Sequence, residues 1–290
     1  MRLWTTLETF FLLLVLTVVS AAGAGAYFIG PEWVSPAMIL AGIISLAWLV
    51  ISGRRRLVVW LEYERAQTQA LVNLHATLPV RAPLPPMTAW AATPEFIALA
   101  LEHIEMSALE KRKAEAGPLT IVECGSGVST LLVAYALQAE GEGMIYSLEH
   151  DEDYAEVADQ RLSLHGLRKH AQVVHAPIHK QSFHGKQRRW YNTARLKLKA
   201  PIDVMIIDGP PKSTARQARY PAFPKFRDQL ADDAWILLDD AARAGERAVV
   251  SRWLDEAEDE LEVRYVDGPK GAAVLKFKRK PTEDTEESVE

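Results

Sequence analysis

Acidic side chains follow several apolar runs of the sequence, at positions where they could bind a ligand. The first run, residues 118–122, is short and rich in β-branched residues, and Glu123 follows it. Gly125 and Gly127 come next, before a helical apolar pattern that starts at Val128. Nucleotides bind at such strand-to-helix turns, because glycines let the backbone turn sharply and the free N–H groups of the new helix face the ligand.

A second acid, Glu149, strengthens this interpretation. It ends the next predicted strand, residues 144–148, about 20 residues beyond the glycines, where the dinucleotide fingerprint has a ribose-binding carboxylate. Thr130 replaces the third glycine of that fingerprint, and the carboxylate of Glu123 would repel a pyrophosphate. A cationic adenosine compound without phosphate therefore fits better. The alternative is a tight turn that binds no ligand.

These residues resemble motif I of the class I S-adenosylmethionine-dependent methyltransferases, in particular the bacterial O-methyltransferase-like group. In that family the first acid holds the methionine amino group, the glycines pass under the methionine moiety, and the second acid bonds the ribose hydroxyls. Ser129 stands where the family has its usual third glycine. The resemblance covers residues 90–278 and implies S-adenosylmethionine as the cofactor. The implied binding residues are Glu123, Gly125, Ser126, Gly127, Ser129, Thr130, Glu149 and Asp208.

Three further acids follow two later apolar runs. Asp208 ends the nearly continuous apolar run 203–207, and Asp239 and Asp240 end the run 235–238. The carboxyl ends of parallel strands meet at the ligand crevice, so we expect these carboxylates to lie close together. Helix capping by Asp239 or Asp240 is the alternative.

The same acids resemble the positions that bind a divalent cation in catechol-type O-methyltransferases. The resemblance implies a Mg²⁺ site of Asp208, Asp239 and Asp240, because clustered carboxylates repel one another unless neutralised and Mg²⁺ prefers oxygen ligands. Asp208 and Lys212 are the predicted catalytic residues, with Lys212 as the proton acceptor. Two departures from the family are the acid at 240 in place of an amide and the position of Lys212, one residue farther from Asp208. In the alternative, a nearby arginine neutralises the acids: Arg216, Arg219 or Arg243.

The order of the runs predicts an α/β fold, a doubly wound and mostly parallel seven-stranded sheet. Near the C-terminus, residues 261–265 and 273–277 are apolar and flank the glycine- and proline-containing turn 267–271, which indicates a hairpin. The family resemblance makes the last strand antiparallel. We interpret the basic segment 179–189 as a solvated loop, and attraction to anionic lipid head groups or to an acidic substrate is the alternative.

The N-terminal part contains two uncharged runs, residues 9–29 and 33–51. Each is close to the length of about 20 residues that crosses a bilayer, which predicts a two-helix transmembrane hairpin. A cleavable signal peptide is the alternative for the first run. Arg2 and residues 54–56, all arginines, flank the two runs, so both ends should face the cytoplasm. This predicts a location at the inner (cytoplasmic) membrane with the catalytic domain facing the cytoplasm.

The expected domain organisation has four parts. They are the transmembrane hairpin at 1–56, an amphipathic linker helix with a proline-rich connection at 57–86, the methyltransferase domain at 87–279 and an acidic, disordered tail at 280–290. The net charge of −5 gives no basic excess for nucleic acid. Cys124 is the single cysteine, which excludes an intramolecular disulfide, and packing in the turn explains it better than catalysis.

The sequence therefore predicts a membrane-anchored S-adenosylmethionine-dependent methyltransferase, with transfer to oxygen as the expected reaction. The expected partners are the lipid bilayer and a small-molecule, lipid-linked or glycan acceptor, and the acceptor itself stays open. One alternative is a catalytically silent module with the cofactor fold that docks a partner at the membrane. A nicotinamide-dependent oxidoreductase is the other, which Glu123 and the final hairpin disfavour.

Overall fold

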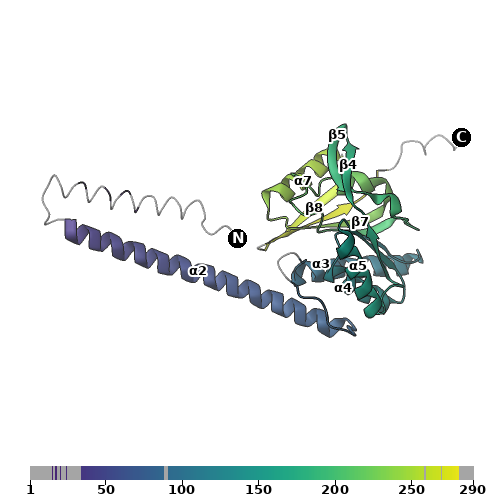
Figure 1. Ribbon diagram of the computed structural model, residues 1–290, viewed down its shortest axis with the longest axis horizontal. Helices are drawn as coiled ribbons and strands as arrows, with labels where there is room; N and C mark the ends of the chain where they lie inside the picture. The colour runs from purple at the N-terminus through teal and green to yellow at the C-terminus, as the bar shows by residue number, and fades with distance from the viewer. Residues whose placement is uncertain are drawn as a thin grey trace. The chain divides into compact units, whose positions relative to one another are not determined.

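The computed structural model of the protein describes residues 34–87, 91–257, 259–268 and 270–280, together with the isolated positions 15, 17, 20 and 24. The chain divides into two compact units, residues 1–65 and residues 66–290, and the boundary falls within helix α2 (Val34–Thr77; Figure 1). Of the predicted acidic tail, only Lys280 lies among the described residues.

Helix α2 differs from the predicted arrangement of a membrane-spanning helix followed by a separate linker helix. It is one helix of 44 residues, because no proline interrupts residues 37–78 and most of the residues after 53 favour helix. Among the described residues, no helix is both long and apolar enough to cross a membrane. The predicted hairpin is thus not found there, and most of its first run, residues 9–29, lies outside the described residues.

The second unit is built on a seven-stranded sheet with the strand order β3-β2-β1-β6-β7-β9-β8. Strand β9 pairs antiparallel with both β7 and β8, and all other neighbours in the sheet are parallel. This confirms the predicted mostly parallel sheet with an antiparallel last strand. The strands are β1 (Thr120–Cys124), β2 (Met144–Glu149), β3 (Ala171–His175), β6 (Ile202–Ile207), β7 (Leu230–Asp239), β8 (Leu261–Val266) and β9 (Ala272–Phe277).

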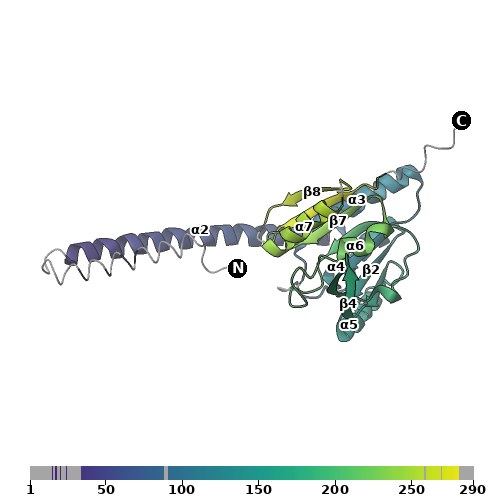
Figure 2. The ribbon, with the colours of Figure 1, turned by 90° about the horizontal axis from the view of Figure 1, so that it is seen from above.

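Helices cover both faces of this sheet (Figures 1 and 2). Strand β1 shows why: Ile121 packs into one hydrophobic core, while Val122 and Cys124 pack into the other. A strand buried on both faces needs a continuous apolar sequence, as predicted. One core holds residues of α3 (Pro94–Ala114), α4 (Val128–Glu140) and α5 (Glu152–Leu164), and the other holds residues of α6 (Ala222–Phe226) and α7 (Ala244–Glu256).

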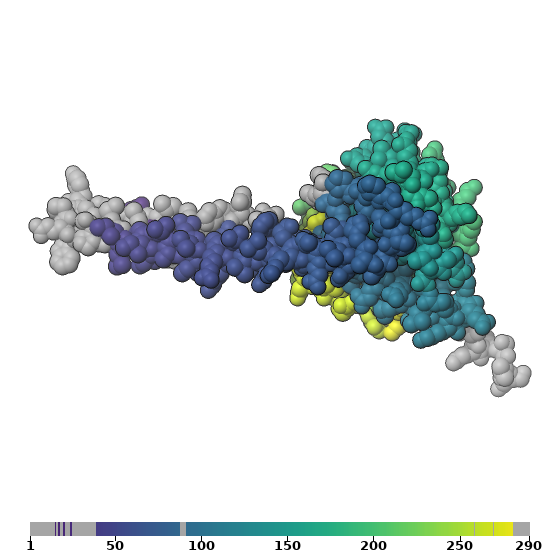
Figure 3. All heavy atoms as spheres, turned by 90° about the horizontal axis from the view of Figure 1, so that it is seen from below, coloured from purple at the N-terminus to yellow at the C-terminus, as the bar shows by residue number. Residues whose placement is uncertain are grey.

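The proline-rich segment before α3 belongs to the second unit and is not a free connection. Leu74 is buried in the core with α3 and α4, and Leu78, Val80 and Leu84 are partly buried against it. The backbone N–H of Arg81 donates to the hydroxyl of Tyr135 in α4 at 2.9 Å. In Figure 3 the blue part of the chain, around residue 80, lies on the surface of this unit.

The basic segment is a β-hairpin and not the loop that we predicted. Strands β4 (Ile178–Phe183) and β5 (Lys186–Tyr191) pair antiparallel, and His184 and Gly185 between them both have positive φ. A two-residue turn of this kind matches the twist of antiparallel strands. Trp190 and Tyr191 at the end of β5 are fully buried in the core beneath α6 and α7 and anchor the hairpin to the sheet.

Candidate active site

Glu149 lies at the carboxyl end of β2, and Nδ1 of the His150 ring lies 2.8 Å from its Oε1. The backbone N–H groups of His150 and Asp151 donate to its Oε1 at 2.7 and 3.0 Å. Ser126, from the glycine turn, donates to Oε2 at 2.8 Å. The structure therefore brings two of the predicted cofactor-binding residues together, and it fixes a carboxylate beside the turn.

Glu123 is more enclosed than the sequence suggested. Its side chain is buried, and its carboxylate accepts hydrogen bonds from the hydroxyls of Ser129, Thr130 and Ser147, the last two at 2.6 Å. Burial raises the pKa of Glu123, and the three hydroxyls partly offset that effect. Since these hydroxyls come from α4 and β2, Glu123 fixes the first turn of α4 against the sheet. Its predicted contact with a methionine amino group stays a prediction.

The two glycines of the turn serve different purposes. Gly125 has a φ of +112°, a conformation that side chains rarely adopt, and a Cβ there would lie 3.5 Å from the backbone nitrogen of Gly209. A Cβ at Gly127 would meet no atom within 4 Å. Its N–H donates to the hydroxyl of Thr130 at 3.1 Å, so the start of α4 is capped while the space in front of Gly127 is open to a ligand.

The other predicted acids gather at the ends of β6 and β7, as expected. Each of Asp208, Asp239 and Asp240 offers an oxygen within 4.8 Å of the others. Asp239 and Asp240 are buried, whereas the side chain of Asp208 is 21% exposed. Asp240 has a φ of +62°, a conformation that is uncommon outside glycine. The turn at Asp240 thus has a strained backbone that places its carboxylate inside the cluster.

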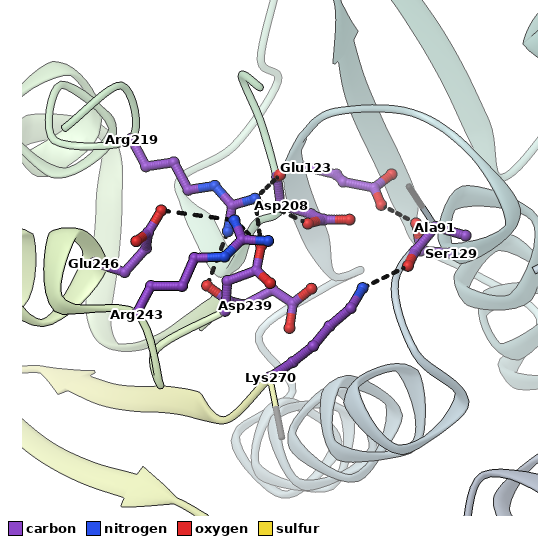
Figure 4. Close-up of polar contacts among 10 residues, drawn as sticks. Ala91, Glu123, Ser129, Asp208, Arg219, Asp239, Arg243, Glu246 and Lys270 are labelled. Atoms are coloured by element: carbon purple, nitrogen blue, oxygen red, sulfur yellow. Dashed lines mark hydrogen bonds and ion pairs between the residues drawn. The ribbon is translucent and has the colours of Figure 1, made fainter. Parts of the chain in front are cut away.

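Arg219 contacts all three acids, and Figure 4 shows it beside Asp208 and Asp239. Its Nη1 donates to the backbone oxygen of Asp239 at 2.8 Å. Its Nη2 lies 3.0 Å from Oδ2 of Asp240 and 3.2 Å from Oδ1 of Asp208, and it also donates to the backbone oxygen of Asp208. Arg219 is only 5% exposed. One buried guanidinium therefore joins the ends of both strands, and this confirms the alternative in which an arginine neutralises the acids.

Arg243 adds a second positive charge at the edge of the cluster. Its Nη1 lies 2.7 Å from Oδ2 of Asp240 and 3.9 Å from Glu246 (Figure 4). Helix α7 begins at Ala244 with Arg243 at the N-cap, so the alternative of helix capping by either aspartate was wrong. Among the contacts of the described residues, Arg216 has none with the acids.

The cluster keeps two free acceptor positions. Burial, followed by the charges of Asp208 and Asp240, raises the pKa of Asp239 to about 7. Burial also raises the pKa of Asp208, and Arg219 partly offsets this. Oδ2 of Asp239 and Oδ1 of Asp240 are buried and have no hydrogen-bond partner among the described residues. Buried oxygens of this kind are costly unless a ligand or water donates to them.

Oxygen ligands at this spacing suit a hard cation such as Mg²⁺. The positive charge of Arg219 in the same place does not suit a cation. Oxygens of Asp208 and Asp240 that a metal ion would need already accept from its guanidinium. A divalent cation would therefore lie against a buried positive charge. The residues present do not fit Mg²⁺ while Arg219 holds this position.

The lysine predicted from the sequence does not contact the acids, and a second lysine, which was not predicted, lies near them. Lys212 is exposed and lines a cavity beside the acids, and no contact of the described residues joins it to them. Lys270, in the turn between β8 and β9, donates to the backbone oxygen of Ala91 at 3.1 Å, and its charge lowers the pKa values of Asp208 and Asp239 (Figure 4). The sequence showed the turn but not that β9 lies beside β7, which places Lys270 near the cluster.

Cys124, at the end of β1, is fully buried. Burial, together with the charge of Glu123, raises the pKa of its thiol. A buried thiol that stays protonated is a poor nucleophile, so Cys124 has a packing role, as expected.

Part of the chain is similar to a known protein family. Residues 122–241, from β1 to the acids after β7, match a family model described as a methyltransferase domain. No curated protein matches the sequence.

Several solved structures are similar to the chain. An O-methyltransferase from Bacillus cereus in complex with SAH is 16% identical over 74% of this chain and 91% of that chain, with a TM-score of 0.48. The O-methyltransferase TomG from Streptomyces achromogenes, in complex with SAM, is 15% identical over 75% of this chain and 99% of that chain, with a TM-score of 0.45.

Proposed function

We propose that this S-adenosylmethionine-dependent methyltransferase transfers the methyl group of S-adenosylmethionine to an oxygen atom of the acceptor. The observation that carries the proposal is the arrangement of one sheet edge. A fixed carboxylate and an open glycine turn lie at β1 and β2, and buried carboxylates with unused oxygens lie at β6 and β7. The first half is suited to the methyl donor and the second to a hydroxyl.

On the donor side, Glu149 would accept hydrogen bonds from the ribose hydroxyls. Its orientation is set in advance by Ser126 and by the N–H groups of His150 and Asp151. Gly127 leaves room for the methionine moiety, since nothing lies near its missing Cβ. Holding donor and acceptor in line is the main contribution that a protein makes to methyl transfer.

On the acceptor side, the free Oδ2 of Asp239 would accept a hydrogen bond from the hydroxyl that is methylated. As the new C–O bond forms and the C–S bond of the sulfonium breaks, the hydroxyl proton passes to this carboxylate. A pKa of about 7 allows Asp239 to accept that proton and release it again near neutral pH. Arg219 supplies the fixed positive charge that holds the neighbouring acids in place. We therefore propose a reaction without Mg²⁺, which could bind only if Arg219 moved away.

The test is binding followed by turnover. The purified protein should bind S-adenosylhomocysteine in calorimetry, and extracts of cells that express it should contain a methylated compound that is missing from cells without the gene. Binding without any new methylated compound would favour the catalytically silent module. Tight binding of NAD in place of S-adenosylhomocysteine would favour an oxidoreductase.

We also propose that the N-terminal unit attaches the enzyme to a membrane, with the catalytic unit on the cytoplasmic side. The support is the absence of charged residues from 9–29 and 33–51, and the exposure of large apolar side chains such as Ile39, Leu46 and Val50 in α2. A topology reporter fused after Glu62 should report the cytoplasm, and one at Glu32 the opposite side. An exported reporter after Glu62 would contradict this orientation.

A further inference from the structure

Positive charge is concentrated in one part of the sequence. Between Gln160 and Ile202 there are ten lysines and arginines and no aspartate or glutamate, although the whole chain has a net charge of −5. This stretch includes the β4–β5 hairpin, which the proposed methyl transfer does not use. Arg168 of this stretch pairs with Asp159, but an excess of positive charge of this size suggests an anionic ligand.

Two cations of the hairpin face each other directly. Lys180 on β4 is opposite Arg189 on β5, and both are exposed. Like charges in directly opposite positions of two antiparallel strands destabilise the strand pair. A ligand whose negative charge pairs with both side chains would remove this repulsion. Arg189 also donates from Nη1 to the backbone oxygen of Thr214 at 3.4 Å. This contact links the hairpin to the loop after β6.

That loop contributes two more cations, Lys212 and Arg216, on either side of Thr214. Both are exposed, and no acid among the described residues contacts Lys180, Arg189, Lys212 or Arg216. The four cations therefore form one group without counter-charge. We call Lys180, Arg189, Lys212 and Arg216 the cationic rim.

A cavity of about 430 Å³ lies beside the rim and next to the acid cluster. Lys212 and Arg216 line it, and so does Arg219, which holds Asp208 and Asp240 at the end of the sheet. Glu246 also lines the cavity, but its carboxylate is 3.9 Å from Arg243. Because Arg219 lines the cavity and also contacts Asp208 and Asp240, the cavity and the acid cluster are neighbours.

We propose that the acceptor carries a phosphate-type anion and that the cationic rim binds this group while the acceptor hydroxyl lies at Asp239. Several cations without an acidic partner suit a group with more than one negative charge, and arginine binds phosphate oxygens in a bidentate manner. The first turn of α7 also lines the cavity, and its N-cap residue makes no side-chain capping bond there. This inference rests on the proposed methyl transfer and names the chemical class of its acceptor.

The experiment uses the full chain in detergent with S-adenosylhomocysteine bound, titrated with inorganic pyrophosphate in a calorimeter. The double variant Lys212→Ala/Arg216→Ala should bind pyrophosphate at least tenfold more weakly, because each charge-assisted hydrogen bond that is lost weakens binding by roughly tenfold. The matched control is Lys113→Ala/Lys169→Ala, which removes two exposed lysines outside the rim and the cavity. It should bind pyrophosphate as the wild type does. Binding of S-adenosylhomocysteine reports that each variant is folded.

A second measurement distinguishes a lipid head group from a soluble phosphorylated acceptor. Vesicles of phosphatidylcholine, with and without phosphatidylglycerol, are compared in flotation assays. Extra binding to phosphatidylglycerol that the rim variant loses, without pyrophosphate binding, identifies a lipid head group, and pyrophosphate binding alone identifies a soluble acceptor. The inference is overturned if the wild type binds pyrophosphate and the rim variant binds it equally well, and also if the wild type binds neither pyrophosphate nor phosphatidylglycerol. Loss of S-adenosylhomocysteine binding by the wild type would instead contradict the proposed function.

Discussion

The two halves of the site hold their carboxylates in opposite ways. At β1 and β2, Glu149 and Glu123 accept from hydroxyls and backbone N–H groups, and Glu149 also contacts the ring of His150, but neither acid contacts an arginine or lysine among the described residues. At β6 and β7, the acids surround the buried guanidinium of Arg219. Neutral donors orient a carboxylate and leave its charge available to a ligand, whereas a buried cation cancels the charge and makes it part of the fold. Binding of the methyl donor should therefore depend on the first half, and stability mainly on the second.

The largest expected effect is on stability. Arg219→Met leaves buried acids without their counter-charge, and breaking a buried ion pair in this way costs about 3–5 kcal/mol. We expect the urea midpoint of unfolding to fall accordingly. Arg195→Met, which removes an exposed arginine, is the matched control and should leave the midpoint unchanged. If both variants unfold at the same urea concentration, Arg219 is not the structural cation of the cluster.

The pH dependence of stability also tests the role of the acids at β6 and β7. The pKa of Asp239 is about 7 in the folded protein, against 3.8 for its ordinary value. Between these values the folded state holds a proton that the unfolded state has released, so stability falls as pH rises, by about 4 kcal/mol at most.

Asp239→Asn should flatten this decline between pH 4 and pH 7 in denaturant titrations. Asp228→Asn, at an exposed acid, should keep it. A wild type whose stability rises steadily over this range would mean that other acids outweigh Asp239. An Asp239→Asn variant that retains the full slope would contradict the assignment of the raised pKa.

Ligand affinity tests the other half of the site. Glu149→Ala should weaken binding of S-adenosylhomocysteine by roughly ten- to a hundredfold, because charge-assisted hydrogen bonds to the ribose contribute about 1.5–3 kcal/mol. Its urea midpoint should change less than that of Arg219→Met. Glu142→Ala, at an exposed acid, is the control in calorimetry. Equal affinity of the two variants would remove Glu149 from the cofactor site.

The smallest expected effect is that of metal removal. Because Arg219 occupies the oxygens that a metal ion would need, turnover of an identified acceptor should be the same before and after treatment with EDTA. Added Mg²⁺ should not increase it. Turnover that falls with EDTA and returns with Mg²⁺ would show that Arg219 leaves the acids during the reaction.

The parts of the site that the sequence predicted lie at the ends of apolar strands. Glu149, Asp208 and Asp239 each end a run whose β character is clear, and the order of parallel strands then brings their ends together. Arg219 lies in the long segment between β6 and α6, where no periodic pattern fixes a side chain, so the sequence offered it only as one of three candidates. Lys270 depends on the pairing of β7 with β9, which is non-local.

The hairpin was missed for a different reason. Strands β4 and β5 carry mostly basic and polar residues, and a search for apolar alternation does not detect such a sequence. The signal was the turn: His184 and Gly185 are suited to positive φ, and Trp190 and Tyr191 follow as the anchor. The length of α2 was also missed. The sequence changes from apolar to charged residues near residue 54, where we predicted a boundary between two helices, but such a change does not end a helix.

The burial of Cys124 has a practical consequence for spectroscopy. Thiol reagents react with exposed thiolates, and the only cysteine of the chain is fully buried with a raised pKa. The native protein should therefore take up no maleimide label while it is folded. A cysteine introduced at Arg216 would be the single reactive position, so a fluorophore could report ligand entry into the cavity with no native residue to remove first.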